Sequence, residues 1–131
     1  MVEVQRFKVD YEETREYREA VSPYDSYINI AVEDSGSTTE KDIITFDIPE
    51  GYKVLVWRLK FNSDQATDIT VISKSNTTET IIDKIRGKTE YDDDHERRPI
   101  YVIKGDQLII RYVQSTAGYI FVRLFIQLVE K

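Results

Sequence analysis

The chain has no cysteine and a single histidine, and each shortage removes a class of chemistry. Without cysteine it has no disulfides, thiolate nucleophiles or sulfur-ligated metals, which fits a reducing cytoplasm or a particle assembled there. A metal motif that needs two histidines is excluded, and a histidine general base could only be His95. The sequence also lacks a glycine-rich phosphate loop and a serine nucleophile elbow. We therefore predict that the protein is not an enzyme and uses no cofactor.

Long apolar runs are missing as well. No segment approaches the roughly 20 apolar residues that span a bilayer. The opening residues Met1-Val2-Glu3-Val4 lack the basic and then apolar regions of a signal peptide. The formal net charge of -6 disfavours nucleic-acid binding, because an acidic protein repels the phosphate backbone. We expect a protein of the cytoplasm or of a particle assembled there, with neither a membrane nor a nucleic acid as its partner.

The dominant pattern in the sequence is apolar alternation with a period of two, which is typical of β-strands. It predicts strands at residues 3–9, 26–33, 42–48, 52–62, 68–73, 100–103, 107–114 and 119–130. In residues 52–62 we assign Leu55, Trp57, Leu59 and Phe61 to the core. The other predicted core residues are Ile28, Ile30, Val32, Ile44, Phe46, Ile48, Ile69, Val71, Leu108, Ile110, Tyr112, Ile120, Val122, Leu124, Ile126 and Leu128.

These roughly eight strands, without a strand–helix–strand rhythm, predict an all-β chain. We expect one domain over residues 1–131, an antiparallel β-sandwich of jelly-roll or Greek-key type. The turn residues Ser115-Thr116-Ala117-Gly118 predict a hairpin between the strands at 107–114 and 119–130.

Two charged segments interrupt the strand pattern. Residues 1–25 are interpreted as an N-terminal arm or strand, in which 11–20 has no clear apolar face. Residues 83–98 are interpreted as a long charged surface loop. The run Asp92-Asp93-Asp94 offers oxygen ligands for a divalent cation, but consecutive aspartates of an extended chain point in opposite directions. We therefore predict no metal site.

The supposed outer face of the last strand is unusually aromatic. Its residues Tyr119, Phe121 and Phe125 are interrupted by Arg123 and Gln127, and the strand at 52–62 begins with Tyr52 and Val54. Aromatic and arginine side chains are enriched at protein interfaces. The predicted interface set is therefore Tyr119, Phe121, Arg123, Phe125, Tyr52 and Val54. The alternative is that the N-terminal segment or the 83–98 loop covers these residues within one chain.

The aromatic content also allows a second function, carbohydrate binding, in which exposed rings stack on sugar faces. The chain has nine tyrosines. The candidates for such a site are Tyr17, Tyr24, Tyr27 and Tyr91, while Trp57 is assigned to the core because it alternates with leucine and phenylalanine.

Three segments carry a resemblance to a known class of proteins. They are residues 48–54 with Pro49-Glu50-Gly51, residues 98–108 with Lys104-Gly105-Asp106, and residues 115–120. Together they resemble small β-sandwich virion proteins, namely capsid decoration proteins and jelly-roll capsid subunits of bacterial and archaeal viruses. The resemblance implies a structural protein of the virion that forms a homo-oligomer, with a trimer favoured, and has other capsid proteins as partners. It implies no catalytic residue.

Overall fold

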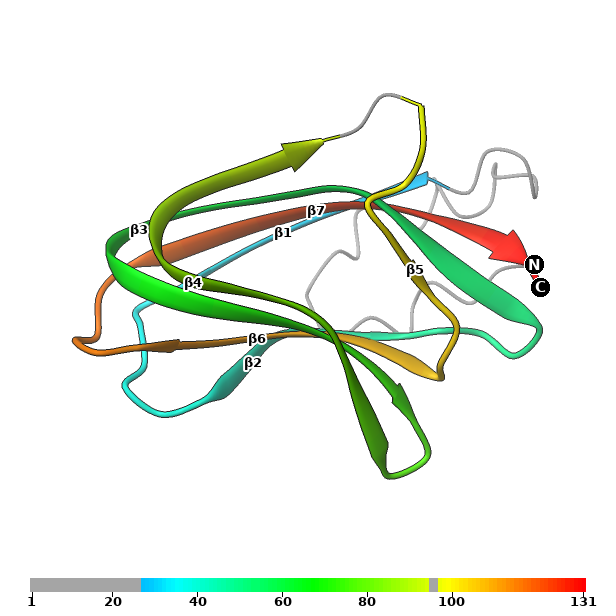
Figure 1. Ribbon diagram of the computed structural model, residues 1–131, viewed down its shortest axis with the longest axis horizontal. Coiled ribbons are helices and arrows are strands. Elements are labelled where there is room, and N and C mark those ends of the chain that lie inside the picture. The colour runs from blue at the N-terminus through cyan, green and yellow to red at the C-terminus, as the bar shows by residue number, and fades with distance from the viewer. Residues whose placement is uncertain (1–26, 95–96) are drawn as a thin grey trace.

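The computed structural model describes residues 27–94 and 97–131, which form seven strands of one antiparallel sheet (Figure 1). The strands are β1 (Tyr27–Asp34), β2 (Lys41–Asp47), β3 (Tyr52–Ser75), β4 (Thr78–Asp94), β5 (Tyr101–Ile103), β6 (Gln107–Gln114) and β7 (Ile120–Glu130). The sheet curls into the β-sandwich or jelly-roll type, which confirms the predicted all-β class. The predicted strand at 3–9 and arm at 1–25 lie outside the described residues. No helix in the described part is long and apolar enough to cross a membrane.

β3 belongs to both layers of the sandwich. It has 24 residues and would be ~80 Å long if it were straight. Its first half pairs with β7 up to Ser63 and its second half pairs with β6 from Thr67. The strand bends between these two residues, at the left of Figure 1. The predicted strands at 52–62 and 68–73 are therefore two parts of one bent strand.

β6 and β7 lie along the same edge of β3, one after the other. β7 pairs with residues Tyr52 to Ser63 of β3, and β6 pairs with residues Thr67 to Lys74. The predicted hairpin between them is wrong, because the two strands pair with β3 and not with each other. The turn at 115–119 instead carries the chain from one layer to the other.

β1 and β2 repeat this arrangement one strand further out. β1 pairs with β7 and β2 with β6, and residues 35–40 cross between the layers. We call the three crossings at 35–40, 63–67 and 115–119 the fold line. The first layer contains β1, β7 and the first half of β3, and the second layer contains β2, β6 and the second half of β3.

The inner faces of the two layers form the core, as the alternation predicted. Every predicted core residue of β1, β2, β6 and β7 is buried, except Val32, which is partly buried against the core. The residues of β3 and β4 in the same cluster are Val54, Val56, Leu59, Phe61, Ile69, Val71 and Ile85.

The first half of β3 corrects one prediction. Val54 and Val56 are fully buried, whereas Leu55 and Trp57 are only half-buried on the opposite face. The reason is a β-bulge: Val56 pairs with Ile126 and Arg58 with Phe125, so Trp57 is an extra residue. A bulge reverses the alternation, and Leu59 and Phe61 beyond it point into the core as predicted.

β4 corrects a second prediction, because the segment expected to be a loop at 83–98 is strand as far as Asp94. β4 pairs with β3 over nearly its whole length and forms the outer edge of the sheet. Its charges suit an edge, where charged side chains prevent pairing with other chains. The sequence shows the charge density but not the long pairing with β3.

Candidate functional site

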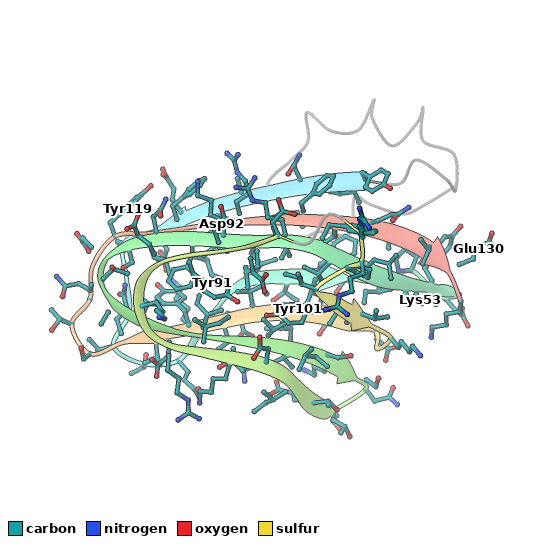
Figure 2. The ribbon with its side chains drawn as sticks, turned by 45° about the horizontal axis from the view of Figure 1, so that its top comes forward. Lys53, Tyr91, Asp92, Tyr101, Tyr119 and Glu130 are labelled. Atoms are coloured by element: carbon teal, nitrogen blue, oxygen red, sulfur yellow. The ribbon has the colours of Figure 1, made fainter. Side chains whose placement is uncertain are left out.

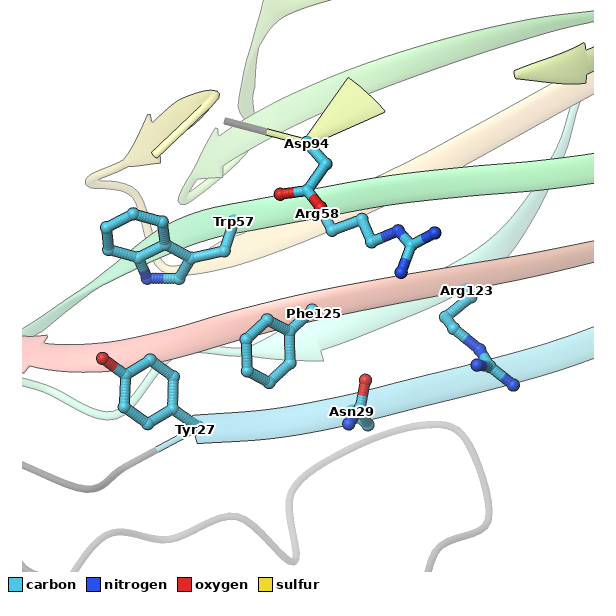
Figure 3. A pocket seen from close by; sticks show the side chains of 7 residues that line it. All are labelled: Tyr27, Asn29, Trp57, Arg58, Asp94, Arg123 and Phe125. Carbon is cyan, nitrogen blue, oxygen red and sulfur yellow. The ribbon is translucent and has the colours of Figure 1, made fainter. Parts of the chain in front are cut away.

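Three aromatic rings gather on the outer face of the first layer, one from each of three neighbouring strands. Tyr27 comes from β1, Phe125 from β7 and Trp57 from β3, and Figure 3 shows the rings around one hollow. The rings of Tyr27 and Phe125 are 5.5 Å apart between centroids, with planes 11° apart. Both residues lie on the outer face because their strand neighbours Ile28 and Ile126 point into the core. We call these three residues the aromatic row.

A hydrogen bond holds Trp57 in the row. Its indole Nε1 donates to Oε1 of Gln127 on β7 over 3.0 Å. Gln127 is the cross-strand neighbour of Tyr27. A half-buried indole N–H needs such a partner, and the bond fixes the Trp57 side chain across the β3–β7 boundary.

The aromatic row forms part of a hollow with a volume of about 650 Å³. We call it the aromatic groove. This volume lies within the range of small-ligand sites, roughly 300–1,000 Å³. The residues that line it are Tyr27, Asn29, Trp57, Arg58, Asp94, Arg123 and Phe125. The groove therefore combines three rings with four polar or charged side chains.

Arg58 enters the groove next to a carboxylate from the edge strand. Its Nε and Nη2 donate to the two carboxylate oxygens of Asp92 over 2.9 and 2.7 Å. This bidentate hydrogen bond raises the pKa of Arg58 and holds the pKa of Asp92 below its ordinary value. The pair is exposed to solvent, so it orients the guanidinium more than it stabilises the fold.

Arg123 differs from Arg58 because no carboxylate holds it. Its guanidinium carbon lies 5.7 Å from the centroid of the Phe121 ring. Within residues 27–94 and 97–131 it forms no ion pair, and its side chain is exposed. Among the described residues, the groove thus has one cation paired with a carboxylate, Arg58, and one without an ion pair, Arg123.

Tyr119 marks the far end of the outer face, beyond Phe121. Its hydroxyl donates to Oε2 of Glu33 on β1 over 2.8 Å. This hydrogen bond raises the pKa of Tyr119. Tyr119 remains 47% exposed and lies just before the first residue of β7, where Figure 2 labels it.

The six residues of the predicted interface set do not all lie on one face. Four of them share the outer face, as expected: Tyr119, Phe121, Arg123 and Phe125. Val54 is fully buried and Tyr52 packs against the core from the same inner face, so both assignments to the interface are wrong. The cause is the alternation before the β-bulge, which places residues 52, 54 and 56 on the inner side.

The predicted carbohydrate set is divided as well. Tyr27 lines the groove, while Tyr17 and Tyr24 lie outside the described residues. Tyr91 is on the inner side, where it stacks on Phe61 with ring centroids 5.8 Å apart. The sequence interpretation missed Asn29, Trp57, Arg58 and Asp94, and no sequence signal marks the bulge that brings Trp57 to the groove.

A second polar cluster lies on the inner side of β4 and β5. The Tyr101 hydroxyl donates to Oδ2 of Asp83 over 2.5 Å, and the Tyr91 hydroxyl donates to Oδ2 of Asp93 over 3.2 Å. Burial raises the pKa of Tyr101 strongly, and the bond to Asp83 raises it further. Each tyrosine hydroxyl thus has a carboxylate as its hydrogen-bond acceptor at the edge of the core.

The acidic run does not converge on a metal site in the described part of the chain. Asp92 and Asp94 are exposed and Asp93 is half-buried, as strand alternation requires. Within residues 27–94 and 97–131, no three acidic or histidine side chains come together. His95 and Glu96 lie outside the described residues.

Comparison with known proteins gives a likeness of fold. No family model matches the chain, and no curated protein matches it. A Bacillus endospore appendage protein, from a family that forms disulfide-linked pili, has a TM-score of 0.51 at 11% identity, over 79% of this chain and 88% of that one. At this identity the likeness shows the β-sandwich type of fold alone.

Two weaker likenesses are also β-rich. A family 32 carbohydrate-binding module from C. perfringens, solved with galactose, has a TM-score of 0.41 at 11% identity, over 79% of this chain and 96% of that one. A designed double-stranded β-helix has a TM-score of 0.28 at 13% identity, over 78% of this chain and 96% of that one. At these scores neither bears on function.

Proposed function

We propose that this chain is a non-enzymatic structural or interaction protein whose copies associate through the outer face of the first layer. The supporting observation is the aromatic character of that face. Tyr27 is 38% and Tyr119 47% exposed, and Trp57, Phe121 and Phe125 are only half-buried. A face that met only water would be more polar at these positions. Burial of the rings between copies would remove this apolar surface from water.

The charges on the same face suit a contact between copies. Arg123 is exposed and unpaired in the described part of the chain, while Asp94 and Glu33 present carboxylates nearby on the same layer. In an assembly, Arg123 of one copy pairs with such a carboxylate of the next copy at the rim of the buried rings. Because both signs are present on this face, charges of one copy can pair with opposite charges of the next copy.

The finer form of the proposal comes from the resemblance to virion proteins. It is a capsid or capsid-decoration subunit that forms a closed ring such as a trimer, contacts other capsid proteins and resides in the virion or the cytoplasm. The chain contains no cysteine, so its copies would associate without the disulfide links of the appendage pili. The β-sandwich fold is compatible with this role but is shared by many functions.

Carbohydrate binding is the second candidate function, and the aromatic groove is the observation that favours it. It needs no contact between copies, but it uses the same rings and the same Arg123, so a bound sugar and a second copy would compete for this face.

The assembly proposal is tested by the native mass in solution, measured by light scattering after size exclusion. We expect a discrete oligomer for the unmodified chain and a folded monomer for Phe121→Ser. Ile81→Ser is the matched control, because Ile81 is 61% exposed on the second layer and lies outside the proposed contact. This control should keep the oligomer mass.

Two results would contradict the proposal. One is a monomer for the unmodified chain over the whole concentration range, and the other is an unchanged oligomer for Phe121→Ser. Circular dichroism shows whether Phe121→Ser is folded. If it is not, Tyr119→Ser serves in its place, because its ring is the more exposed of the two.

A further inference from the structure

We propose that the aromatic groove binds an acidic sugar, a pyranose that carries a carboxylate or a sulfate. In this complex the sugar ring packs on the aromatic row and its anionic group binds Arg123. The site is complete within one copy of the chain, so the inference does not depend on assembly.

The aromatic row provides the stacking surface. The axial C–H bonds of a pyranose ring point outward from its faces, and their positive hydrogens are attracted to the negative face of an aromatic ring. The planes of Tyr27 and Phe125 are 11° apart, and Figure 3 shows the faces of both rings turned towards the viewer. Trp57 extends this surface onto β3. The hydrogen bond to Gln127 holds its indole in place before any ligand binds, which lowers the entropy lost on binding.

Polar groups next to the row can read the sugar hydroxyls. Asn29 is exposed on β1, and its amide offers both a donor and an acceptor. Asp94 is exposed on β4 and accepts hydrogen bonds. Apolar walls with a small number of placed polar groups are the usual composition of a small-ligand site.

Arg123 favours an acidic sugar over a neutral one. Among the described residues, the charged side chains that line the groove are Arg58, Arg123 and Asp94. Arg58 is already held by Asp92. Arg123 has no ion-pair partner in the described part of the chain, and a guanidinium fork matches the oxygens of a carboxylate or sulfate. Arg123 is therefore the group that would bind the anion.

The chain contains its own probe for this test. Trp57 is the sole tryptophan and lines the groove, so its fluorescence reports directly on occupancy. The titrants are polygalacturonate, alginate and hyaluronan for carboxylates, dextran sulfate and chondroitin sulfate for sulfates, and dextran and galactan as neutral controls. We expect saturable fluorescence changes with at least one acidic polymer, weakened by salt, and none with the neutral polymers.

Variants identify the residues involved. Arg123→Gln should lower the affinity for the bound acidic polymer about tenfold, as expected for the loss of a charge-assisted pair. Arg86→Gln is the matched control. Arg86 is also exposed, but it lies on β4 beside the second half of β3 and is not among the described residues that line the groove. Phe125→Ala should weaken binding through the loss of stacking. Tyr119→Ser should keep the affinity, because Tyr119 is not among the described residues that line the groove.

Several results would overturn the inference. It fails if no acidic polymer changes the fluorescence, if neutral polymers bind equally well, or if Arg123→Gln binds as tightly as the unmodified chain. Loss of binding in a folded, monomeric Tyr119→Ser would show that one copy does not hold the site. Retained binding in a chain that never assembles would contradict the assembly proposal alone.

Discussion

Gly36 and Gly118 meet backbone to backbone at the fold line: a Cβ on Gly36 would lie 2.3 Å from the amide nitrogen of Gly118. Gly36 has a φ of 110°, a conformation that other residues rarely adopt. The contact joins the crossings at 35–40 and 115–119. Because of this contact, the connection from β1 to β2 and the connection from β6 to β7 cross between the layers side by side.

Replacing Gly36 by alanine should therefore destabilise the fold strongly. We expect Gly36→Ala to lower the free energy of unfolding by ~2–4 kcal/mol, because it combines a strained φ with a steric clash. Gly51→Ala is the control, since Gly51 also has a positive φ but nothing within 4 Å of its added Cβ. That control should lose ~1 kcal/mol. Urea denaturation measures both, and equal losses would contradict the role of the contact.

Gln114 ties the same crossings together from the inside. Its side chain is 2% exposed, and its Oε1 accepts from the amides of Ser37 and Gly118 over 3.2 and 3.0 Å. Its Nε2 donates to the hydroxyl oxygens of Ser63 and Thr67. One side chain thus satisfies polar groups from all three parts of the fold line.

Gln114→Leu keeps the approximate volume but removes these bonds. We expect it to lower the free energy of unfolding by ~2–4 kcal/mol, because two half-buried amide donors and two hydroxyl groups lose their partner on a buried side chain. Gln107→Leu is the matched control: Gln107 is half-buried and its side chain donates to Asp47. It should lose ~1 kcal/mol. Chemical denaturation that ranked the two variants in the opposite order would contradict this interpretation.

The bulge at Trp57 makes a prediction about two leucines of one strand. Leu59 is fully buried and Leu55 is half-buried on the outer face. Leu59→Ala should lower the free energy of unfolding by ~3 kcal/mol, and Leu55→Ala by ~1 kcal/mol. Without the bulge both leucines would point to the same face. Equal losses in urea denaturation would therefore argue for an unbroken alternation.

The alkaline titration of the tyrosines should separate two of them from the rest. Burial raises the pKa of Tyr112, and its hydrogen bond to Asp34 raises it further. Burial and Asp83 do the same for Tyr101. Because a raised folded pKa favours the protonated form, their contribution to stability is present below the unfolded value of about 10 and is lost as the pH rises above it.

Phenolate absorbance, followed during an alkaline titration, measures this effect. Tyr101 and Tyr112 should ionise last, together with unfolding, and Tyr112→Phe should remove one late-ionising group from the curve. The prediction fails if Tyr112→Phe leaves the late part of the curve unchanged.

An acid titration tests the ion pairs on the second layer. Arg111 donates from Nη1 and Nη2 to both carboxylate oxygens of Glu79 at 2.9 Å, and from Nε to Asp42 at 2.6 Å. The bond to Arg111 lowers the pKa of Glu79 below its unfolded value of 4.5. The resulting stability is present above that value and is lost as the pH falls through the folded pKa. Arg111→Gln should therefore reduce the loss of stability between neutral and acidic pH, measured by urea denaturation. An unchanged loss would contradict the coupling.

The core and the long strands could be predicted because alternation is local. In β1, β6 and β7 every second side chain is apolar, and all of these residues face the core as expected. For β4 the prediction of a loop at 83–98 was wrong. The exposed charges of this segment indicate solvent contact, but they do not distinguish a loop from an edge strand. The aromatic outer face was found from the sequence, but the groove within it was not.

By itself, the sequence determined the strands with clear apolar alternation, namely β1, β2, β6 and β7, and which of their faces avoid water, because these properties depend on neighbouring residues only. The tertiary structure decided that β3 bends, that β6 and β7 follow one another along its edge, and that a bulge turns Trp57 outward. These features depend on which distant segments pair and in what register. The aromatic groove exists because three strands far apart in the sequence meet at that bulge, and residue periodicity carries no information about such a meeting.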